Sequence, residues 1–304
     1  MADIHQQITQ HGRDTLLATA SSKEERRIIE IAAEVMADEN ERLGISYSGF
    51  CLTALPHRRI DESTWVRKGH KITLVVQSGV DRTGTYVGVP YGSRARMILL
   101  YLQTRALQTG CREVELGRSM ADWLERMGMS VGGKTYKDVR DQANRISRSV
   151  LQFFWDLPEG REVRAKEGIV SRDIAFSADG RQSEMFPETV ELSETFFRAL
   201  KDHPVPVLES AIRQISNKSM ALDAYIWLAY RLHSLDRPTK LSWTSLFQQF
   251  GAGYAEMKHF KPEFTGSLKM AIAAYPESRI DLDAKEGVTL FPSPPPISKL
   301  GIGR

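Results

Sequence analysis

The sequence predicts a helix-rich α+β fold with two modules in tandem, and three observations support this prediction. A short amphipathic segment, a glycine turn and a longer amphipathic segment follow one another between residues 117 and 155. The same order of segments returns about 125 to 130 residues later. Each copy ends in a segment that can form a hairpin. With 304 residues and 41% hydrophobic content, the chain can give each module its own core.

Composition and spacing exclude several classes of protein. Cys51 and Cys111 lack the spacing of a zinc site or a disulfide framework, which favours a reducing compartment such as the cytoplasm. No apolar run reaches the roughly 18 to 20 residues that span a bilayer, and the polar N-terminus does not resemble a signal peptide. The scattered histidines and the lack of a G-x-S-x-G motif predict no catalytic residue, no metal and no cofactor. The net charge of +3 permits an anionic partner.

Residues 1–46 are predicted to form an N-terminal arm and one helix. Residues 1–20 are polar, which predicts a mobile arm. Ser21 and Ser22 can cap a helix that Gly44 ends. The predicted inner face of this helix consists of Ile28, Ile31, Ala32 and Val35. We assign no function to the cations near its start, Lys23, Arg26 and Arg27.

The first predicted domain covers residues 47–187 and begins with a small sheet. The segments GFCLTALP, HKITLVVQSG and TYVGVP are rich in β-forming residues. A helix follows in SRARMILLYLQTRALQTG and ends at Gly110. Its predicted buried side consists of Met97, Leu100, Tyr101, Thr104 and Leu107. The segment EVEL, residues 113–116, is predicted to be a single strand.

A pair of helices with a glycine turn follows this strand. Ser119, with Asp122 three residues later, predicts a cap for a short helix. The inner residues of this helix are Met120, Trp123, Leu124 and Met127. The turn contains Gly128, Gly132 and Gly133. A second helix, Thr135 to Phe153, is predicted to bury Tyr136, Val139, Ala143, Ile146, Val150 and Phe153.

The opposite face of the second helix is polar and mainly basic, with Lys137, Arg140, Asp141, Asn144 and Arg148. A helix-turn-helix whose second helix enters a major groove explains this pattern. Two ordinary surface helices explain it as well, because Asp138 and Asp141 dilute the positive charge. Under the first interpretation, Arg140 and Asn144 read bases, while Lys137 and Arg148 contact phosphates. Lys134 and Arg145 complete the predicted DNA-binding set of this helix.

The segment after Trp155 predicts an exposed hairpin, which in a winged helix touches backbone phosphates. Its candidates for these contacts are Arg161, Arg164 and Lys166. An ordinary hairpin is the alternative, because these charges are balanced by Glu159, Glu162 and Glu167. Between Ala178 and Pro187 the chain turns polar without periodicity, which predicts the boundary between the domains.

The second predicted domain, residues 188–292, repeats the order of the first. Its segments ALDAYIWLAYRLHSL, KLSW and TSLFQQFGAGY take the places of the first long helix, the single strand and the short helix. The outer face of the next helix combines lysines with small residues that let a duplex approach: Lys258, Gly266, Lys269 and Ala273. The predicted DNA contacts are Lys258, Lys261, Lys269 and, at a wing over 279–291, Arg279 and Lys285. Repetition of this order favours two tandem winged-helix domains over ordinary surface helices. Residues 293–304 are predicted to be a disordered proline-rich tail.

The segment from Gly128 to Thr135 matches the phosphate-binding pattern G-x-x-x-x-G-K-[ST] of nucleotide-hydrolysing enzymes. In those enzymes a strand of a parallel sheet enters the loop. Here an amphipathic helix is predicted to enter it, and no later apolar strand ends in an acid suited to Mg²⁺. The turn of a helix-turn-helix explains the glycines. A P-loop NTPase is therefore the weaker alternative, and we predict that the protein is not an enzyme.

Several long segments in order resemble the RepA-type plasmid replication initiators of Gram-negative bacteria. These segments are GVPYGSRARMILLYLQTRAL, REVELGRSMADWLERMG, GGKTYKDVRDQANRISR, HPVPV and ALDAYIWLAYRL. The resemblance implies tandem winged-helix domains that bind repeats, or iterons, in double-stranded plasmid origin DNA. It also implies origin opening, recruitment of host helicase, polymerase and initiator proteins, and a homodimer when the protein represses its own promoter.

The resemblance further implies that the C-terminal module is a main reader of each repeat. We therefore predict that a fragment from Glu188 to Ser298 binds origin repeats on its own, more weakly than the whole chain. A transcriptional repressor with the same two modules and no role in replication is the nearer alternative, because initiation and repression use one DNA surface.

Overall fold

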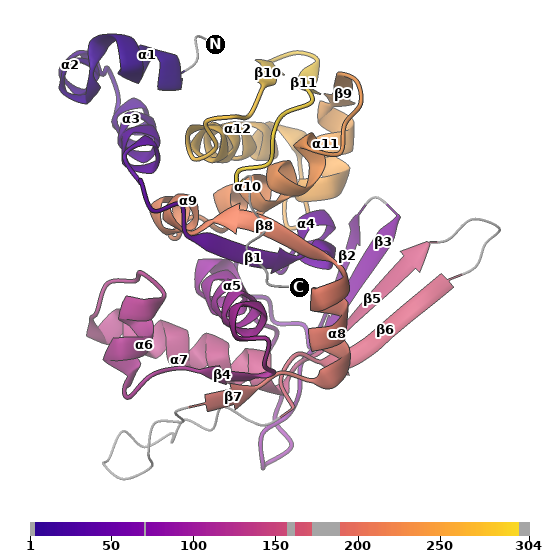
Figure 1. Ribbon diagram of the computed structural model, residues 1–304. Helices are drawn as coiled ribbons and strands as arrows, with labels where there is room; N and C mark the ends of the chain where they lie inside the picture. Colours follow the sequence, from indigo (N-terminus) through magenta and orange to yellow (C-terminus); the bar gives the residue numbers. More distant parts are fainter. Residues whose placement is uncertain (1–3, 70, 157–161, 172–188, 298–304) are drawn as a thin grey trace. The chain divides into compact units, whose positions relative to one another are not determined.

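The computed structural model describes residues 4–69, 71–156, 162–171 and 189–297. The chain forms two compact units (Figure 1). The central unit comprises Ile45–Pro204, and the terminal unit combines Met1–Gly44 with Val205–Arg304. These units divide the chain differently from the predicted domains, because the N-terminal segment belongs with the C-terminal one.

The central unit extends from β1 to β8, two strands that the boundary between the units crosses. Its elements are β1 (Leu43–Tyr47), α4 (Ser48–Leu52), β2 (Thr64–Gly69), β3 (Ile72–Gln77), α5 (Gly92–Thr109), β4 (Glu113–Glu115), α6 (Met120–Arg126), α7 (Gly133–Arg148), β5 (Val150–Asp156), β6 (Glu162–Gly168), β7 (Thr189–Glu191), α8 (Glu194–Asp202) and β8 (Pro204–Leu208). The polar stretch predicted to contain the domain boundary, 178–187, lies outside the described residues. β7 and α8 belong to this unit because β7 pairs with β4 and α8 packs on α5.

An antiparallel sheet with the strand order β2-β3-β5-β6 forms one layer of the central unit. Its inner face buries Leu74 opposite Phe153, together with Ile72, Val76 and Leu151. The Phe153 ring packs edge-on against Tyr47 and Phe50, with centroids 5.2 and 5.4 Å away. α4 packs on β3, and α8 packs on β6. This alternation of inner and outer residues is the pattern of a sheet with one buried face.

α5 is the central helix of this unit. Its predicted buried side is confirmed, since Met97, Leu100, Tyr101, Thr104 and Leu107 are all less than 9% exposed. Gly110 follows the helix with φ +66°, the left-handed conformation that glycine adopts without steric cost. Arg96, 5% exposed, donates hydrogen bonds to the carbonyls of Leu55, Pro56 and Gly92. A buried guanidinium thereby fixes the start of α5 against the loop before it.

Three predicted elements of the central unit are wrong in type or extent. The segment GFCLTALP forms the short helix α4 instead of a strand, and TYVGVP contributes one isolated bridge between Val80 and Tyr86. The helix predicted to reach Phe153 ends at Arg148, and β5 begins at Val150. The run VLQFFW is rich in β-formers, and its pairing with β3 and β6 outweighs the helical spacing of its apolar residues.

The terminal unit has helices at both ends of the sequence. Its elements are α1 (Ile4–His11), α2 (Arg13–Thr19), α3 (Lys23–Met36), α9 (Glu209–Ile215), α10 (Ser219–Leu232), β9 (Thr239–Ser242), α11 (Trp243–Phe250), α12 (Met257–Ala273), β10 (Ile280–Asp283) and β11 (Gly287–Leu290). β11 lies between β9 and β10 in one antiparallel sheet. α10 and α12 pack together around buried aromatic rings, among them Phe250 and Phe264 with centroids 5.0 Å apart.

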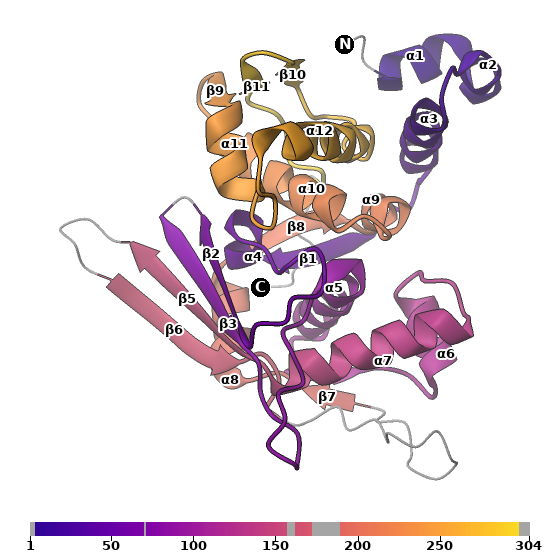
Figure 2. The same cartoon turned by 180° about the vertical axis from the view of Figure 1, so that it is seen from behind.

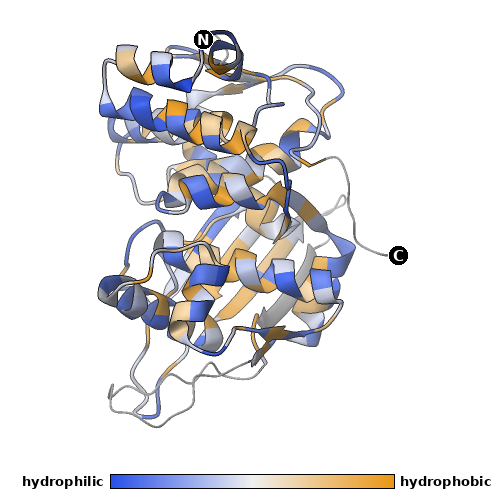
Figure 3. Cartoon of the chain, turned by 60° about the vertical axis from the view of Figure 1, so that its left-hand side comes forward, coloured by the Kyte–Doolittle hydropathy of each residue, from blue (hydrophilic) through white to orange (hydrophobic). Residues whose placement is uncertain are grey.

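The N-terminal segment is folded, so the prediction of a mobile arm is wrong for residues 4–19. α1 and α2 pack on α3, and His5, 7% exposed, has Nε2 at 2.9 Å from the carbonyl oxygen of Ala273. α3 begins after the predicted cap Ser22, buries Ile29, Ile31, Ala32 and Val35, and packs on α9 and α12. It ends at Met36, well before Gly44. Figure 3 shows that single helices of the chain carry both hydrophilic and hydrophobic residues, as expected when one face of a helix is buried.

The start of the predicted disordered tail also packs on the terminal unit. The Tyr275 hydroxyl donates a 2.6 Å hydrogen bond to the carbonyl of Pro294, and Ser293 and Ile297 are buried. Residues 298–304 lie outside the described residues. Of the described helices, none is long and apolar enough to cross a membrane.

Candidate nucleic-acid interface

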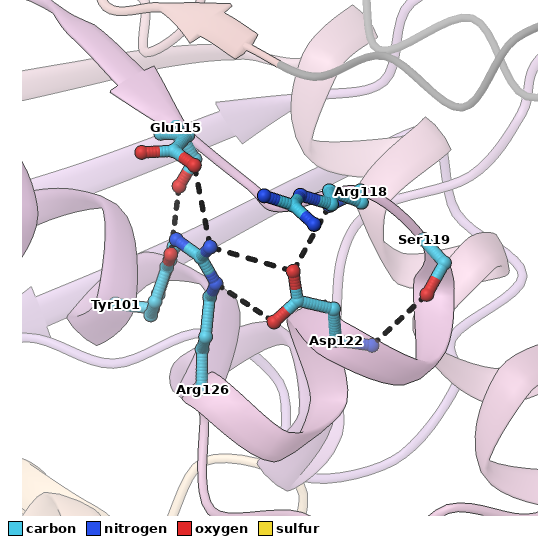
Figure 4. Close-up of polar contacts among 6 residues, drawn as sticks. All are labelled: Tyr101, Glu115, Arg118, Ser119, Asp122 and Arg126. Atoms are coloured by element: carbon cyan, nitrogen blue, oxygen red, sulfur yellow. Dashed lines mark hydrogen bonds and ion pairs between the residues drawn. The ribbon is translucent and has the colours of Figure 1, made fainter.

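The short helix α6 is held in place by a polar cluster that includes residues from both of its ends (Figure 4). Arg126 donates from Nε to Asp122 at 2.9 Å and from Nη2 to Glu115 of β4 at 3.2 Å. The Tyr101 hydroxyl of α5 donates to the Glu115 carbonyl at 2.7 Å. Groups of α5, β4 and α6 thus meet in one cluster, which ties α6 to β4 and α5.

The predicted cap of α6 is confirmed in a modified form. Ser119 Oγ accepts a hydrogen bond from the amide of Asp122 at 3.2 Å, whereas the Asp122 carboxylate accepts from the amide of Arg118 at 3.0 Å. Hydrogen bonds from Arg126 and from this amide lower the pKa of Asp122, and the same Asp122 raises the pKa of Arg126. Burial raises the pKa of Tyr101.

α7 lies beside α6 (Figure 2). Its outer face is basic. Lys134, Lys137 and Arg140 are exposed, and Asn144 and Arg148 are half-buried. The Arg148 guanidinium also donates to the carbonyl of Val80 at 3.3 Å. The structure thus brings five of the six predicted α7 residues to its surface, one side chain every three to four residues.

Arg145 is the exception among the α7 candidates. It is 5% exposed, its Nε lies 2.9 Å from the Asp141 carboxylate, and its guanidinium lies 5.2 Å from the centre of the Tyr91 ring. It also donates to the carbonyl of Val89 at 3.3 Å. We therefore remove Arg145 from the DNA-binding set, because its hydrogen-bonding groups hold the segment before α5 against α7.

The hairpin after α7 is present as the strands β5 and β6. Register pairs Arg164 with Phe154 and Lys166 with Gln152. Only the backbone of these two cations is described, and Arg161 lies outside the described residues. The hairpin therefore has the predicted place in the chain, and its phosphate contacts stay a prediction.

The terminal unit repeats this arrangement with α11, α12 and the hairpin β10–β11. Ser242 Oγ caps α11 by accepting from the amide of Ser245 at 3.2 Å, as Ser119 caps α6. Lys258 is exposed near the start of α12 and pairs with Glu256 at 2.8 Å. Lys261 lies over the Trp243 ring at 4.8 Å and donates to the carbonyl of Ala284 at 3.3 Å.

The two predicted wing residues of this unit are both exposed. Lys285 lies in the turn of the hairpin, where its amide donates to Asp283 Oδ1 at 2.7 Å. Hydrogen bonds from the amides of Glu286 and Lys285 lower the pKa of Asp283. Arg279 immediately precedes β10. An ionised Asp283 thus holds the turn that presents Lys285.

The small residues of α12 contact helices of the same unit. A Cβ atom on Gly266 would lie 3.7 Å from Glu24 Oε1 of α3, and the Ala273 carbonyl accepts a 2.9 Å hydrogen bond from His5 Nε2 of α1. Lys269 pairs with Glu24 at 3.3 Å. The prediction that Gly266 and Ala273 let a duplex approach is therefore wrong, because α1 and α3 occupy that side of α12.

The segment matching the phosphate-binding pattern connects two helices. α6 ends at Arg126, Met127 is its C-cap, and α7 begins at Gly133. Gly128 has φ +68°, which explains the first glycine as a residue that ends a helix. Among the described residues, no group of three or more His, Cys, Asp or Glu side chains could hold a metal ion.

Two features were missed by the sequence patterns. One is the polar cluster of Figure 4, for which the spacing of Asp122 and Arg126 by four residues was a usable signal. The other is the loop over residues 80–86, whose Val80 carbonyl accepts from Arg148 at the end of α7. Within this loop Asp81 Oδ1 accepts from the amides of Thr83 and Thr85, and the side chains of Val80 and Tyr86 are exposed. No periodic pattern marks such a loop.

Comparisons with known proteins agree with this architecture. Two solved structures are similar: selenomethionine derivatives of domains 2 and 3 of RctB, and the RctB domains 2–3, each with a TM-score of 0.50. The first is 16% identical and covers 74% of this chain and 84% of that one; the second is 14% identical and covers 80% and 94%. At these identities the likeness concerns the fold alone. The comparison with curated protein sequences gives no significant match.

One family model matches the central part of the chain. It is described as plasmid encoded RepA protein, and it covers residues 89–245, which include α5, α6, α7 and the segments up to α11. The match confirms the resemblance that the sequence segments carried, over more than half of the chain. The chain belongs to the family of plasmid-encoded RepA replication initiators.

Proposed function

We propose that this protein initiates plasmid replication by binding double-stranded origin DNA through two winged-helix modules, with α7 and α12 each entering a major groove. The observation that carries the proposal is the recurrence of one arrangement in both units. A short helix capped by a serine, α6 or α11, precedes a longer helix with exposed cations, which a hairpin then follows. A major groove admits an α-helix, and a hairpin beside it reaches phosphates.

The two modules supply different chemistry. On α7, Arg140 and Asn144 can pair bidentately with guanine and adenine edges, and Lys134, Lys137 and Arg148 are suited to phosphates. On the terminal unit, Lys258, Lys261, Arg279 and Lys285 surround the exposed start of α12 and its hairpin. Arg164 and Lys166 of β6 belong to the corresponding hairpin of the central unit.

Family membership supports replication initiation as the role of this binding. We propose that the sites are iterons, that binding helps open the origin, and that the protein recruits host helicase and initiator proteins. We further propose that it represses its own promoter as a homodimer. The protein acts by binding, without catalysis or a cofactor.

The test is a footprint of the purified protein on DNA flanking its own gene. Several evenly spaced protected repeats are expected for an initiator. A single protected palindrome would instead favour a transcriptional repressor without a replication role. Plasmid maintenance with the protected repeats supplied as the only origin then separates the two.

A nucleotide-hydrolysing enzyme is the remaining candidate, favoured by the match over Gly128–Thr135 alone. The helix that enters this segment argues against it, because phosphate-cradling loops follow a strand. Titration with ATP and GTP in the presence of Mg²⁺ is expected to give no saturable binding. Micromolar affinity lost in Lys134→Ala would refute both this expectation and the assignment of α7 to DNA.

A further inference from the structure

We infer that the loop over residues 80–86 extends the DNA surface of α7 by contacting the DNA backbone beside the major groove that α7 occupies. The inference rests on the proposed function, because it deepens the DNA contact of the central unit. Arg82 supplies a positive charge, and Tyr86 supplies an aromatic ring and a hydroxyl. The loop lies in the connection between β3 and α5, before the residues 89–245 that the family model matches.

The loop is attached to the end of α7. Arg148, the last residue of this helix, donates from Nη1 to the Val80 carbonyl at 3.3 Å. A Cβ atom on Gly79 would overlap the Arg148 carbonyl oxygen, so only glycine lets the chain pass this close to the helix. In Figure 2 the connection between β3 and α5 projects below the end of α7. Arg148 lies on the same face of α7 as Lys137 and Asn144, so the loop continues the predicted DNA-binding face.

Hydrogen bonds within the loop fix its shape. Val80 and Tyr86 form an antiparallel bridge, and the Asp81 amide donates to the Thr85 carbonyl at 2.8 Å. Gly84 has φ +82°, and its amide donates to the Asp81 carbonyl at 3.0 Å. A loop that is already ordered loses little conformational entropy when it binds a partner.

The loop presents a positive charge to solvent. Asp81 is its only acid, and the Asp81 carboxylate accepts from the amides of Thr83 and Thr85 at 2.8 and 3.0 Å. The nearby Arg148 guanidinium stabilises the charge of Asp81. Arg82 is exposed, and its side chain forms no ion pair or hydrogen bond with the described residues. The Arg82 guanidinium can therefore bind an anion without giving up a contact within the described part of the chain.

Val80 and Tyr86 give the loop an apolar side. The two residues lie opposite each other in the bridge, so their side chains lie on one side of the loop, where they are 47% and 62% exposed. The described residues expose five large apolar side chains, and two of the five belong to this loop. Arginine and tyrosine side chains both contact the phosphates and sugars of DNA. This combination therefore suits a sugar-phosphate strand.

The position of the loop along α7 also favours the backbone over the bases. Asn144 is the last proposed base contact of α7, and Arg148 follows it by about 6 Å along the helix axis. Arg148 is proposed to contact a phosphate, so the strand that borders the groove runs past the loop that Arg148 holds. In homeodomains the end of the recognition helix likewise contacts the backbone.

The test is binding of the full-length protein to its footprinted origin DNA at several salt concentrations. Arg82→Ala is expected to weaken binding to all sequences alike and to lower the slope of log K against log salt by about 0.9, the contribution of one phosphate contact. Between 50 and 200 mM salt its affinity should therefore fall about threefold less than that of the wild type. Arg82→Lys should keep the wild-type slope. Tyr86→Ala should bind more weakly with an unchanged slope, because tyrosine carries no charge at neutral pH.

A series of duplexes shortened base pair by base pair from either end locates the contact. The wild type should lose affinity at the step that removes the phosphate bound by Arg82, and Arg82→Ala should lose less at that step, because the two changes remove the same interaction. Lys68→Ala is the matched control, since Lys68 is an exposed cation at the far end of the β2–β3 hairpin from the loop. It should keep the wild-type slope and the wild-type response to shortening. Thermal unfolding should be unchanged in all these variants, because their side chains are exposed.

Specific binding by the wild type, with an unchanged slope and an unchanged response to shortening in Arg82→Ala, would overturn the contact and leave the proposed function intact. Failure of the wild type to bind any site specifically would overturn both. Wild-type DNA binding by Arg82→Ala and Tyr86→Ala together with a loss of plasmid maintenance would overturn DNA as the occupant and indicate a host protein at this loop.

Discussion

Burial separates the roles of two arginines on α7 that the sequence pattern treats alike. Arg140 is exposed on the outer face, whereas Arg145 is 5% exposed and bound to Asp141 and the Val89 carbonyl. An arginine that must satisfy buried acceptors cannot also read a base. The two side chains therefore predict different phenotypes on removal.

Arg145→Ala is expected to lower the free energy of unfolding by about 1 to 3 kcal/mol, because it removes charged hydrogen bonds and the contact with Tyr91. Urea denaturation followed by circular dichroism measures this loss. Arg140→Ala is the control and should stay within about 0.5 kcal/mol of the wild type. A fully stable Arg145→Ala protein with weakened DNA binding would restore Arg145 to the interface.

Arg140→Ala is expected to weaken binding to the origin site by about 1 to 3 kcal/mol and to relax the preference at one base pair. Lys137→Ala should weaken binding to all sequences alike and lower the salt slope by about 0.9. Binding to a set of single-base variants of the site distinguishes the two patterns. If Arg140→Ala changes neither affinity nor base preference, α7 serves a protein contact instead.

At the scale of elements, the position of α7 depends on how α6 is held. Asp122 links the amide before the cap to Arg126, which in turn reaches Glu115 of β4 (Figure 4). Because the folded-state pKa of Asp122 is lowered, its contribution to stability is present above the unfolded pKa of about 3.9 and disappears as pH falls through the folded value.

Asp122→Asn is therefore expected to be less stable than the wild type at neutral pH, and the difference should shrink as pH falls below the unfolded pKa of about 3.9. Thermal unfolding of both proteins between pH 3 and pH 7 measures it. Glu125→Gln, in the same helix and outside the polar cluster, is the control and should show no such convergence. A difference that stays constant from pH 7 to pH 3 would mean that ionisation of Asp122 does not stabilise α6.

At the scale of the whole molecule, the terminal unit is built from both ends of the chain. α3 buries Ile29, Ile31, Ala32 and Val35 on this unit, and α1 reaches the Ala273 carbonyl through His5. Full burial of each large apolar side chain stabilises a fold by about 1.5 to 3 kcal/mol. Without residues 1–44, α9 and α12 would expose the apolar surface that α3 covers.

The fragment 188–298 is therefore expected to unfold with low cooperativity, although its sequence contains the complete second helix pair and hairpin. Supplying residues 1–44 as a fusion to residues 205–304 should restore a cooperative transition. Thermal unfolding by circular dichroism compares the two polypeptides. A cooperative transition in the shorter fragment would show that α3 is dispensable for this unit.

Local chemistry accounts for the elements that were predicted correctly. A serine accepting an amide three residues later starts α3, α6 and α11, and a glycine in the left-handed conformation ends α5. These signals act within one helical turn, so they are readable from neighbouring residues. The helix pair, its basic outer face and the repeated order followed from them, and the family match agrees with the segments that carried the resemblance.

Contacts between distant segments account for the rest. Val150 and Phe153 keep the helical spacing of α7, yet they form a strand because β3 and β6 offer partners. Arg145 is a residue type that often contacts DNA, but it is buried because it binds the Asp141 carboxylate and the Val89 carbonyl. Gly266 and Ala273 have small side chains or none, which leaves room beside α12. α1 and α3, more than 200 residues away in sequence, occupy this side of α12. The spacing of apolar residues and the pattern of charges identify the faces of a helix. What each face contacts depends on which surfaces the folded chain brings together.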